Sequence, residues 1–242
     1  MGGEDFIGQT FTAPPQTVAR LTDAVTRWIS PDLAANILEI GCGTGELLCS
    51  LAAALPFAQL TGIDLSEPNI ELARQKAVEL GYSHRLTFVA GDFMRQEGSR
   101  YDVIVSASTL HLIDYPTRQL LDKVCANIRA SGLLVFTMPD GGIFNQALWL
   151  VRRVARRLRG PLMDRLVLTT AKALHGRDFP EPLLVERVRY MYLLPHCSYG
   201  ARFKRLLRSH CGLEMLAETA EPHVSLGQPK HRLCVYRKVC AS

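Results

Sequence analysis

Apolar residues along this chain recur in two alternating patterns. Five short runs rich in Ile, Leu, Val and Phe are bounded by polar residues, proline or glycine, which is typical of buried β-strands. Before and between these runs, apolar residues recur every three or four positions, which is typical of amphipathic helices. The predicted strands cover residues 36–40, 58–64, 85–90, 101–108 and 133–139. Strands separated by helices of this length favour a parallel sheet with helices on both faces.

The helices between these strands have recognisable ends. Ser66 is a candidate N-cap, and Gly81 is a candidate C-terminal stop for the same helix. The last helix before the fifth strand is expected to end near Gly132. The four predicted helices begin near residues 14, 47, 66 and 120.

Beyond the fifth strand the pattern changes. Residues 143–178 have helical spacing, are rich in Arg and show no obvious strand, and residues 189–195 are ambiguous between strand and loop. Ser198 is a candidate cap for a helix that continues through Leu207. Two further strands are predicted at residues 212–220 and 231–239. Their short connection favours an antiparallel pair that closes the sheet.

Three glycines follow the first strand in the stretch "EIGCGTGEL". A dinucleotide-binding loop has the pattern G-x-G-x-x-G, but Glu46 stands where the third glycine of that pattern is expected. Glu39 lies just before the loop. Because carboxylates repel a pyrophosphate, this loop favours a ligand that carries positive charge and no phosphate.

The stretch "EIGCGTG" resembles the first motif of the class I S-adenosylmethionine-dependent methyltransferases, acidic-x-G-x-G-x-G, at every defined position. The resemblance extends over roughly residues 15–140 and to the C-terminal strand pair. It implies an α/β, Rossmann-like, seven-stranded and mostly parallel sheet with an antiparallel C-terminal strand. It also implies a single domain over 1–242, with an N-terminal helical lid at 1–30 and a helical cap for the substrate at 141–200.

The resemblance implies S-adenosylmethionine as cofactor and S-adenosylhomocysteine as product. Asp64, at the end of the second strand, can accept hydrogen bonds from both ribose hydroxyls. By the resemblance, Asp92 accepts from the adenine amino group and Phe93 covers the ring. The alternatives are that the two aspartates only cap turns and that Glu39 only braces the loop. The expected cofactor-binding residues are Glu39, Gly41, Cys42, Gly43, Gly45, Asp64, Leu65, Asp92, Phe93 and Ser106.

Candidates for acceptor binding and catalysis lie elsewhere. His111 follows the fourth strand and is a candidate general base, since an ordinary histidine has a pKa near neutrality; the favoured alternative is a structural histidine. In the family, residues 1–20 and the cap would set acceptor specificity. Asn145, Tyr190 and Tyr199 are the candidate acceptor contacts in the cap, with ordinary packing as the alternative.

Composition adds limits to this interpretation. The chain is 48% hydrophobic and 21% charged, with a net charge of +5, and much of the arginine excess lies between residues 152 and 208. Residues 148–159 have an apolar face surrounded by arginines, which suggests an acidic membrane or RNA, but a cap helix with a solvated arginine face is favoured. The fourth-strand exit also lacks the N/D-P-P-aromatic motif of amino-group methylases, so nucleic acid is disfavoured as a substrate.

The seven cysteines are odd in number and form no C-x-x-C pair, so neither a disulfide framework nor a zinc site is expected, and no metal is predicted. No signal peptide or membrane-spanning run is recognisable, so a cytoplasmic location is expected.

Three functions remain open from the sequence. The first is methyl transfer to O, N or C of a small molecule. The second is a non-methylating reaction, such as intramolecular cyclisation that releases methylthioadenosine. The third is a catalytically silent, cofactor-binding partner subunit. Either a monomer or a homodimer is compatible with each of them.

Overall fold

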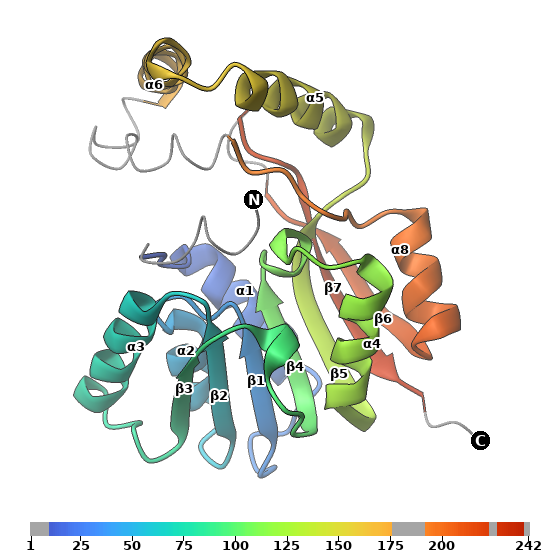
Figure 1. The fold of residues 1–242 in the computed structure, drawn as a ribbon. Coiled ribbons are helices and arrows are strands. Elements are labelled where there is room, and N and C mark those ends of the chain that lie inside the picture. Colours follow the sequence, from blue (N-terminus) through green and yellow to red (C-terminus); the bar gives the residue numbers. More distant parts are fainter. Residues whose placement is uncertain (1–9, 176–191, 223–226, 240–242) are drawn as a thin grey trace.

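In the computed structural model, residues 10–175, 192–222 and 227–239 are described. They form one seven-stranded sheet in the order β3-β2-β1-β4-β5-β7-β6 (Figure 1). All neighbouring pairs from β3 to β5 are parallel, whereas β7 is antiparallel to both β5 and β6. The strands are β1 (Asn36–Ile40), β2 (Gln59–Asp64), β3 (Leu86–Ala90), β4 (Tyr101–Ala107), β5 (Ile128–Pro139), β6 (Leu213–Ala220) and β7 (His231–Lys238). The predicted Rossmann-like fold class is confirmed.

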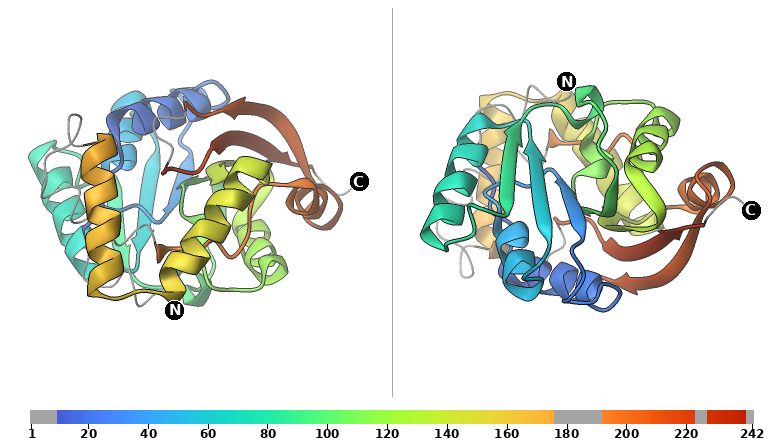
Figure 2. Two further views of the ribbon diagram at one scale, coloured as in Figure 1. Left: turned by 90° about the horizontal axis from the view of Figure 1, so that it is seen from above. Right: turned by 90° about the horizontal axis from the view of Figure 1, so that it is seen from below.

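Helices cover both faces of the sheet, and a buried core lies on each side (Figure 2). One core joins the sheet to α1 (Pro15–Thr26), α2 (Glu46–Ala54) and α3 (Glu67–Glu79). The other joins it to α4 (Thr117–Asn127) and to α8 (Ala201–Arg205), which continues into the π-helical turn η5 (Leu206–His210). The buried Ile37 of β1 belongs to one core and the buried Leu38 and Ile40 to the other, which explains why both faces of this strand are largely apolar.

The segment predicted to be a cap, residues 141–200, contains α5 (Ile143–Arg157) and α6 (Pro161–His175), which follow the carboxyl end of β5 and lie above the sheet in Figure 1. Both helices fall within the segment predicted to be helical. The ambiguous segment contains no strand in its described part, residues 192–195. Among the described residues, no helix is both long and apolar enough to cross a membrane.

Two local predictions were wrong in detail, and a third was confirmed in position. Helix α4 ends at Asn127 rather than near Gly132, because Ile128 already pairs with Tyr101 of β4 and so begins β5. Gly200, not Ser198, is the N-cap of α8. Ser66 does occupy the N-cap position of α3, but its side chain makes no capping hydrogen bond there.

Candidate functional site

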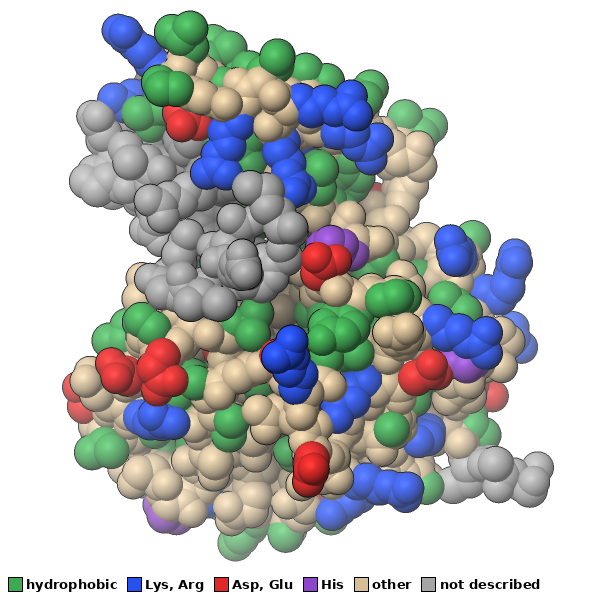
Figure 3. Space-filling view, in the orientation of Figure 1, with side chains coloured by type: hydrophobic (Ala, Val, Ile, Leu, Met, Phe, Trp, Pro, Cys, Tyr) green, Lys and Arg blue, Asp and Glu red, His purple; other side chains and the backbone are tan. Residues whose placement is uncertain are grey.

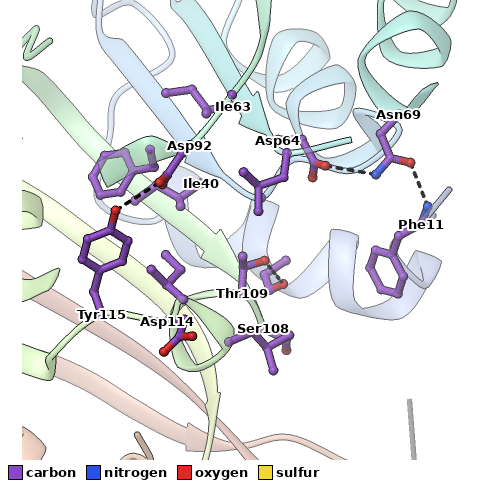
Figure 4. A pocket seen from close by; sticks show the side chains of 17 residues that line it. Phe11, Ile40, Ile63, Asp64, Asn69, Asp92, Ser108, Thr109, Asp114 and Tyr115 are labelled. Carbon is purple, nitrogen blue, oxygen red and sulfur yellow. Dashed lines mark hydrogen bonds between the residues drawn. The ribbon is translucent and has the colours of Figure 1, made fainter. Parts of the chain in front are cut away.

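A pocket opens at the carboxyl ends of β1, β2 and β4, next to the turn that follows β3 (Figure 4). This is the edge at which ligands bind in open α/β sheets. Its lining is mostly apolar, with a few polar side chains that converge from several loops. The lining residues are Phe11, Ile40, Gly41, Ile63, Asp64, Leu65, Asn69, Gly91, Asp92, Phe93, Ala107, Ser108, Thr109, Leu112, Ile113, Asp114 and Tyr115.

The glycine loop between β1 and α2 adopts a backbone that favours glycine. Gly41, Gly43 and Gly45 have φ of +74°, +51° and +82°, a region that side chains with a Cβ rarely adopt. Gly41 lines the pocket, whereas Gly43 and Gly45 pack behind it against Phe11 and Phe88. The loop therefore brings its backbone to the pocket edge without a side chain between them.

Asp64 ends β2 and connects this loop to the start of α3. Its Oδ2 accepts a hydrogen bond from the Gly43 backbone N–H (2.9 Å), and its Oδ1 accepts from the Ser66 N–H (2.9 Å) and from the Asn69 side-chain amide (3.1 Å). A carboxylate has about four acceptor positions, so three protein donors leave room for a ligand hydroxyl. Asp64 therefore both caps the turn and lines the pocket.

Asp92 lies across the pocket from Asp64 (Figure 4). Its Oδ1 accepts from the Met94 N–H (2.9 Å), which caps the short 3-10 turn η2 (Phe93–Arg95), and its Oδ2 accepts from the Tyr115 hydroxyl (3.3 Å). Phe93 is buried and lines the same part of the pocket. A carboxylate beside an aromatic face is suited to a flat, amino-bearing ring.

The N-terminal segment, which was expected to be part of a lid, supplies a pocket wall through Phe11, a residue that the sequence did not single out. The Phe11 N–H donates to Asn69 Oδ1 (2.8 Å), and its carbonyl accepts from the Thr44 N–H (3.0 Å). These bonds lay the segment before α1 across the glycine loop and place the Phe11 ring at the pocket (Figure 4). No periodic pattern marks residues 10–14, so sequence reasoning had no signal for this contact.

We expect Gly43→Ala to release this segment. A Cβ at Gly43 would lie 2.4 Å from the Phe11 carbonyl oxygen, so the segment must move, and the positive φ adds about 1–2 kcal/mol of backbone strain. Gly81→Ala is the matched control, because Gly81 has φ +75° but open space around it. Thermal unfolding should show a larger loss for Gly43→Ala than for Gly81→Ala; equal losses would contradict the contact.

Glu39 is buried beneath the glycine loop, 2% exposed, and its Oε2 has no hydrogen-bond partner among the described residues. Burial, followed by the nearby Glu46 and Asp64 carboxylates, raises the pKa of Glu39 well above its ordinary value. A buried carboxylate without a counter-charge destabilises the protein unless it is protonated or meets a cation.

Glu46 plays a different part from the one inferred from the sequence. Its carboxylate pairs with Lys76 and accepts from the Thr44 hydroxyl (2.8 Å), so its charge is compensated, and it does not line the pocket. The expected repulsion of a pyrophosphate therefore rests on Glu39 and Asp64 rather than on Glu46.

The remaining predicted cofactor residues lie in or just behind the pocket wall. Leu65 lines the pocket. Cys42 is buried in the core beneath the loop. Ser106 is fully buried in β4, and its hydroxyl donates to the Ile40 carbonyl (3.0 Å), so it joins β4 to the end of β1 instead of lining the pocket.

His111 lies in the turn after β4 but does not line the pocket. Its ring packs edge-on against His231, with ring centroids 5.9 Å apart. Burial, with the nearby His231, Arg152 and His196, lowers the pKa of His111 well below its ordinary value. Its backbone carbonyl accepts from the His196 N–H (2.8 Å), which attaches the cap to the sheet. This placement favours the structural alternative over a general base.

The two neutral histidines predict a pH dependence of stability. Burial lowers the pKa of His231 to about 4, and that of His111 also lies below its ordinary value. Between pH 6.5 and 4 the unfolded chain binds protons that the folded chain does not. The free energy of unfolding therefore falls with decreasing pH, by about 1.4 kcal/mol per pH unit for each histidine. Unfolding of a His111→Asn, His231→Asn double variant should show a smaller slope in this range; an unchanged slope would contradict the assignment.

The structure does not bring two of the predicted acceptor contacts, Asn145 and Tyr199, to the pocket. The Asn145 amide is fully buried, donates to the Lys230 carbonyl (2.8 Å) and accepts from the Lys230 N–H (2.8 Å). Tyr199 is buried in a sheet core, and its hydroxyl bonds to that of Tyr236 (2.8 Å). Both side chains are used in packing, and Tyr190 lies outside the described residues.

Known proteins match this chain in sequence and in fold. Residues 38–134 match a family described as "Methyltransferase domain". The malonyl-[acyl-carrier protein] O-methyltransferase of Priestia megaterium is 34% identical over 46% of this chain and 39% of its own length. The carboxy-S-adenosyl-L-methionine synthase of Wolinella succinogenes is 35% identical over 42% of each protein. The chain thus matches only about two fifths of the length of either relative.

Solved structures extend the likeness of the fold to most of the chain. The magnesium protoporphyrin IX methyltransferase of Synechocystis PCC 6803 with bound SAH covers 92% of this chain and 82% of its own, with a TM-score of 0.62 at 18% identity. The N-methyltransferase NodS of Bradyrhizobium japonicum covers 93% and 88%, with a TM-score of 0.58 at 18% identity. By these matches, residues 38–134 of this chain are similar to a methyltransferase domain, and most of the chain shares the Rossmann-like fold of solved methyltransferases.

Proposed function

We propose that this protein transfers the methyl group of S-adenosylmethionine to a small-molecule acceptor. The observation that carries the proposal is the pocket with Asp64 and Asp92 on its two sides; the buried carboxyl of Glu39, in β1 just before the glycine loop, does not line this pocket but has no partner among the described residues. A ligand with a cationic amino acid part, a ribose and an aminopurine supplies a matching group for each of these carboxylates.

In the proposed complex, Asp64 offers its one remaining acceptor position to the ribose hydroxyls and holds the loop through the Gly43 N–H. Asp92 accepts from the adenine amino group while Phe93 covers the ring, and Tyr115 orients Asp92. Glu39 faces the positive charge of the amino acid part. When bound, the cofactor supplies a methyl group already activated by its sulfonium. The protein then contributes alignment of the acceptor and exclusion of water.

We further propose that residues 1–30 act as a lid and 141–200 as a cap over one domain, 1–242. The described part of the lid already contacts the glycine loop through Phe11. The cap meets the pocket rim where His196 Nδ1 lies 3.2 Å from the Asp114 carboxylate. The acceptor would then enter between lid and cap, near Leu112 and Asp114.

A second candidate is a reaction that uses S-adenosylmethionine without transferring its methyl group. One of the matched relatives is named for making carboxy-S-adenosylmethionine, so likeness in this part of the chain does not by itself specify methyl transfer. The same cofactor contacts serve both reactions.

The deciding experiment follows the cofactor by mass spectrometry, with and without a panel of hydroxyl, amine and carboxylate acceptors. S-adenosylhomocysteine that forms only with an acceptor supports the proposal. Methylthioadenosine, or any other nucleoside product without an acceptor, supports the second candidate. Calorimetry that detects no binding of S-adenosylmethionine would overturn both and leave the catalytically silent alternative.

A further inference from the structure

The outer face of cap helix α5 is apolar and exposed. Ile143, Leu150, Val154 and Leu158 are spaced by seven, four and four residues, so they fall along one side of the helix, and they are 49–85% exposed. Hydrophobic side chains gather along the top of the cap in Figure 3. A continuous apolar surface that is exposed to solvent usually marks a site of contact with a protein, a membrane or a ligand.

The inner face of α5 holds the polar residues. Asn145 and Arg152 are buried, and the Arg152 guanidinium donates to the Gly227 carbonyl (2.9 Å) and stacks over the Trp149 ring. The orientation is thus the reverse of a helix that packs its apolar side on a core. The sequence favoured a solvated arginine face for residues 148–159, yet Val151 and Leu158 of that segment are exposed. The described residues leave the apolar side chains of α5 largely exposed, so packing within this part of the chain does not explain why they are apolar.

Helix α6 extends the same kind of surface. Leu162 and Leu166, one turn apart, are 85% and 59% exposed. We call the outward side chains of the two helices the cap face. It comprises Ile143, Leu150, Val151, Val154, Leu158, Leu162 and Leu166.

The cap face lies in the most basic part of the chain. Residues 143–175 contain seven Lys and Arg and one Asp, a net charge of +6, whereas the whole chain carries +5, so all other residues together carry −1. Arg153 and Arg157 flank the apolar row of α5, and Arg165 lies beside Leu166 on α6; all three are exposed.

An anionic lipid surface satisfies both properties at once. Apolar side chains enter the boundary between headgroups and acyl chains, while flanking arginines meet the acidic headgroups. A second copy of the chain would place two strongly basic surfaces against each other, and a nucleic acid would leave the apolar row without a partner. We propose that α5 and α6 dock the cap on anionic membranes. This proposal does not depend on the reaction proposed above.

The test is flotation of the full chain with vesicles of phosphatidylcholine alone and of phosphatidylcholine mixed with phosphatidylglycerol. We expect binding to the anionic vesicles and little to the neutral ones. A Leu150→Glu, Val154→Glu double variant should lower the bound fraction at least tenfold, because carboxylates would enter the apolar boundary beside anionic lipid. Val78→Glu is the matched control, since Val78 is exposed on α3, far from the cap in sequence and 66% exposed, and its binding should be unchanged.

A second variant separates charge from apolar contact. Arg153→Glu with Arg157→Glu should remove the preference for anionic vesicles while leaving the apolar row intact. Equal binding by all variants, or no binding of the unaltered protein to anionic vesicles, would overturn the proposal. So would a dimer in sedimentation equilibrium that the Leu150→Glu, Val154→Glu variant abolishes, or binding to an oligonucleotide in the absence of vesicle binding. None of these readouts depends on turnover of S-adenosylmethionine.

Discussion

Asp64→Ala is expected to weaken S-adenosylmethionine binding by about 2–3 kcal/mol, or roughly 30- to 150-fold. The change removes the acceptor proposed for the ribose hydroxyls. It also leaves the Gly43 and Ser66 N–H groups and the Asn69 amide without the carboxylate that now accepts from them. The glycine loop and the start of α3 would therefore lose their common anchor. Calorimetric titration of the cofactor measures the effect.

The matched control for Asp64 is Glu67→Ala, three residues further along the chain. Glu67 is an exposed acid in the first turn of α3 that pairs with Arg74 and does not line the pocket. Its removal deletes the same unit of charge, so its affinity for the cofactor should stay within about twofold of the unaltered protein, as expected for a screened surface charge. If the two variants weaken binding equally, the loss of affinity comes from a general electrostatic effect and not from a specific contact of Asp64.

Asp64→Asn distinguishes the two roles of the residue. The amide keeps the shape and one acceptor oxygen but presents an N–H₂ donor in place of the other oxygen. Its oxygen can still accept from the Ser66 N–H and the Asn69 amide, whereas its N–H₂ group would face the Gly43 N–H, so we expect a smaller loss of stability than in Asp64→Ala and the loss of most of the affinity. Recovery of full affinity by asparagine would show that Asp64 acts only on the loop.

Most strand bounds could be predicted because the pattern that marks them is local. Ile37, Leu38 and Ile40 of β1 are buried between two cores, and the glycines that follow this strand have a backbone that only glycine adopts readily. The end of α4 was misplaced because the register of β5 against Tyr101 is a long-range pairing, which helical spacing does not reveal.

The site residues that lie at the ends of strands could be predicted from the sequence, whereas those that depend on the placement of the cap could not. Asp64 and Asp92 terminate adjacent parallel strands, so topology alone brings them to one pocket. Tyr199 is a polar aromatic residue of the kind that often lines pockets, but its hydroxyl is hydrogen-bonded to that of Tyr236. Phe11 lies in an aperiodic segment, and only its backbone bonds to Thr44 and Asn69 place it. Aromatic and polar character alone therefore did not identify which cap residues lie at the pocket.

The buried carboxyl group of Glu39, whose Oε2 has no hydrogen-bond partner among the described residues, gives the sharpest test of the cofactor site. Because its pKa in the folded protein lies above the ordinary carboxyl value, the folded chain keeps a proton that the unfolded chain has lost in the interval between those two values. Stability of the ligand-free protein therefore falls as pH rises through this interval, by about 1.4 kcal/mol per pH unit from this group. Glu39→Gln removes the titration and should raise the unfolding temperature by several degrees at neutral pH.

The same change is expected to weaken S-adenosylmethionine binding by about 1.5–3 kcal/mol, because a neutral amide replaces the carboxylate proposed to face the positive charge of the cofactor. Binding to the unaltered protein should also strengthen as pH rises and Glu39 loses its proton, whereas the Glu39→Gln variant lacks this dependence. Thermal unfolding and calorimetric titration across pH measure both effects.

Glu46→Gln is the control with the opposite sign. Glu46 belongs to the same loop, but its charge is compensated by Lys76 and supported by Thr44, so its loss should lower stability and leave cofactor affinity nearly unchanged. A Glu39→Gln variant that is destabilised like Glu46→Gln would mean that Glu39 braces the loop. A stabilised variant with weakened binding would mean that the protein retains a buried charge at the expense of its own stability because the cofactor supplies the missing cation.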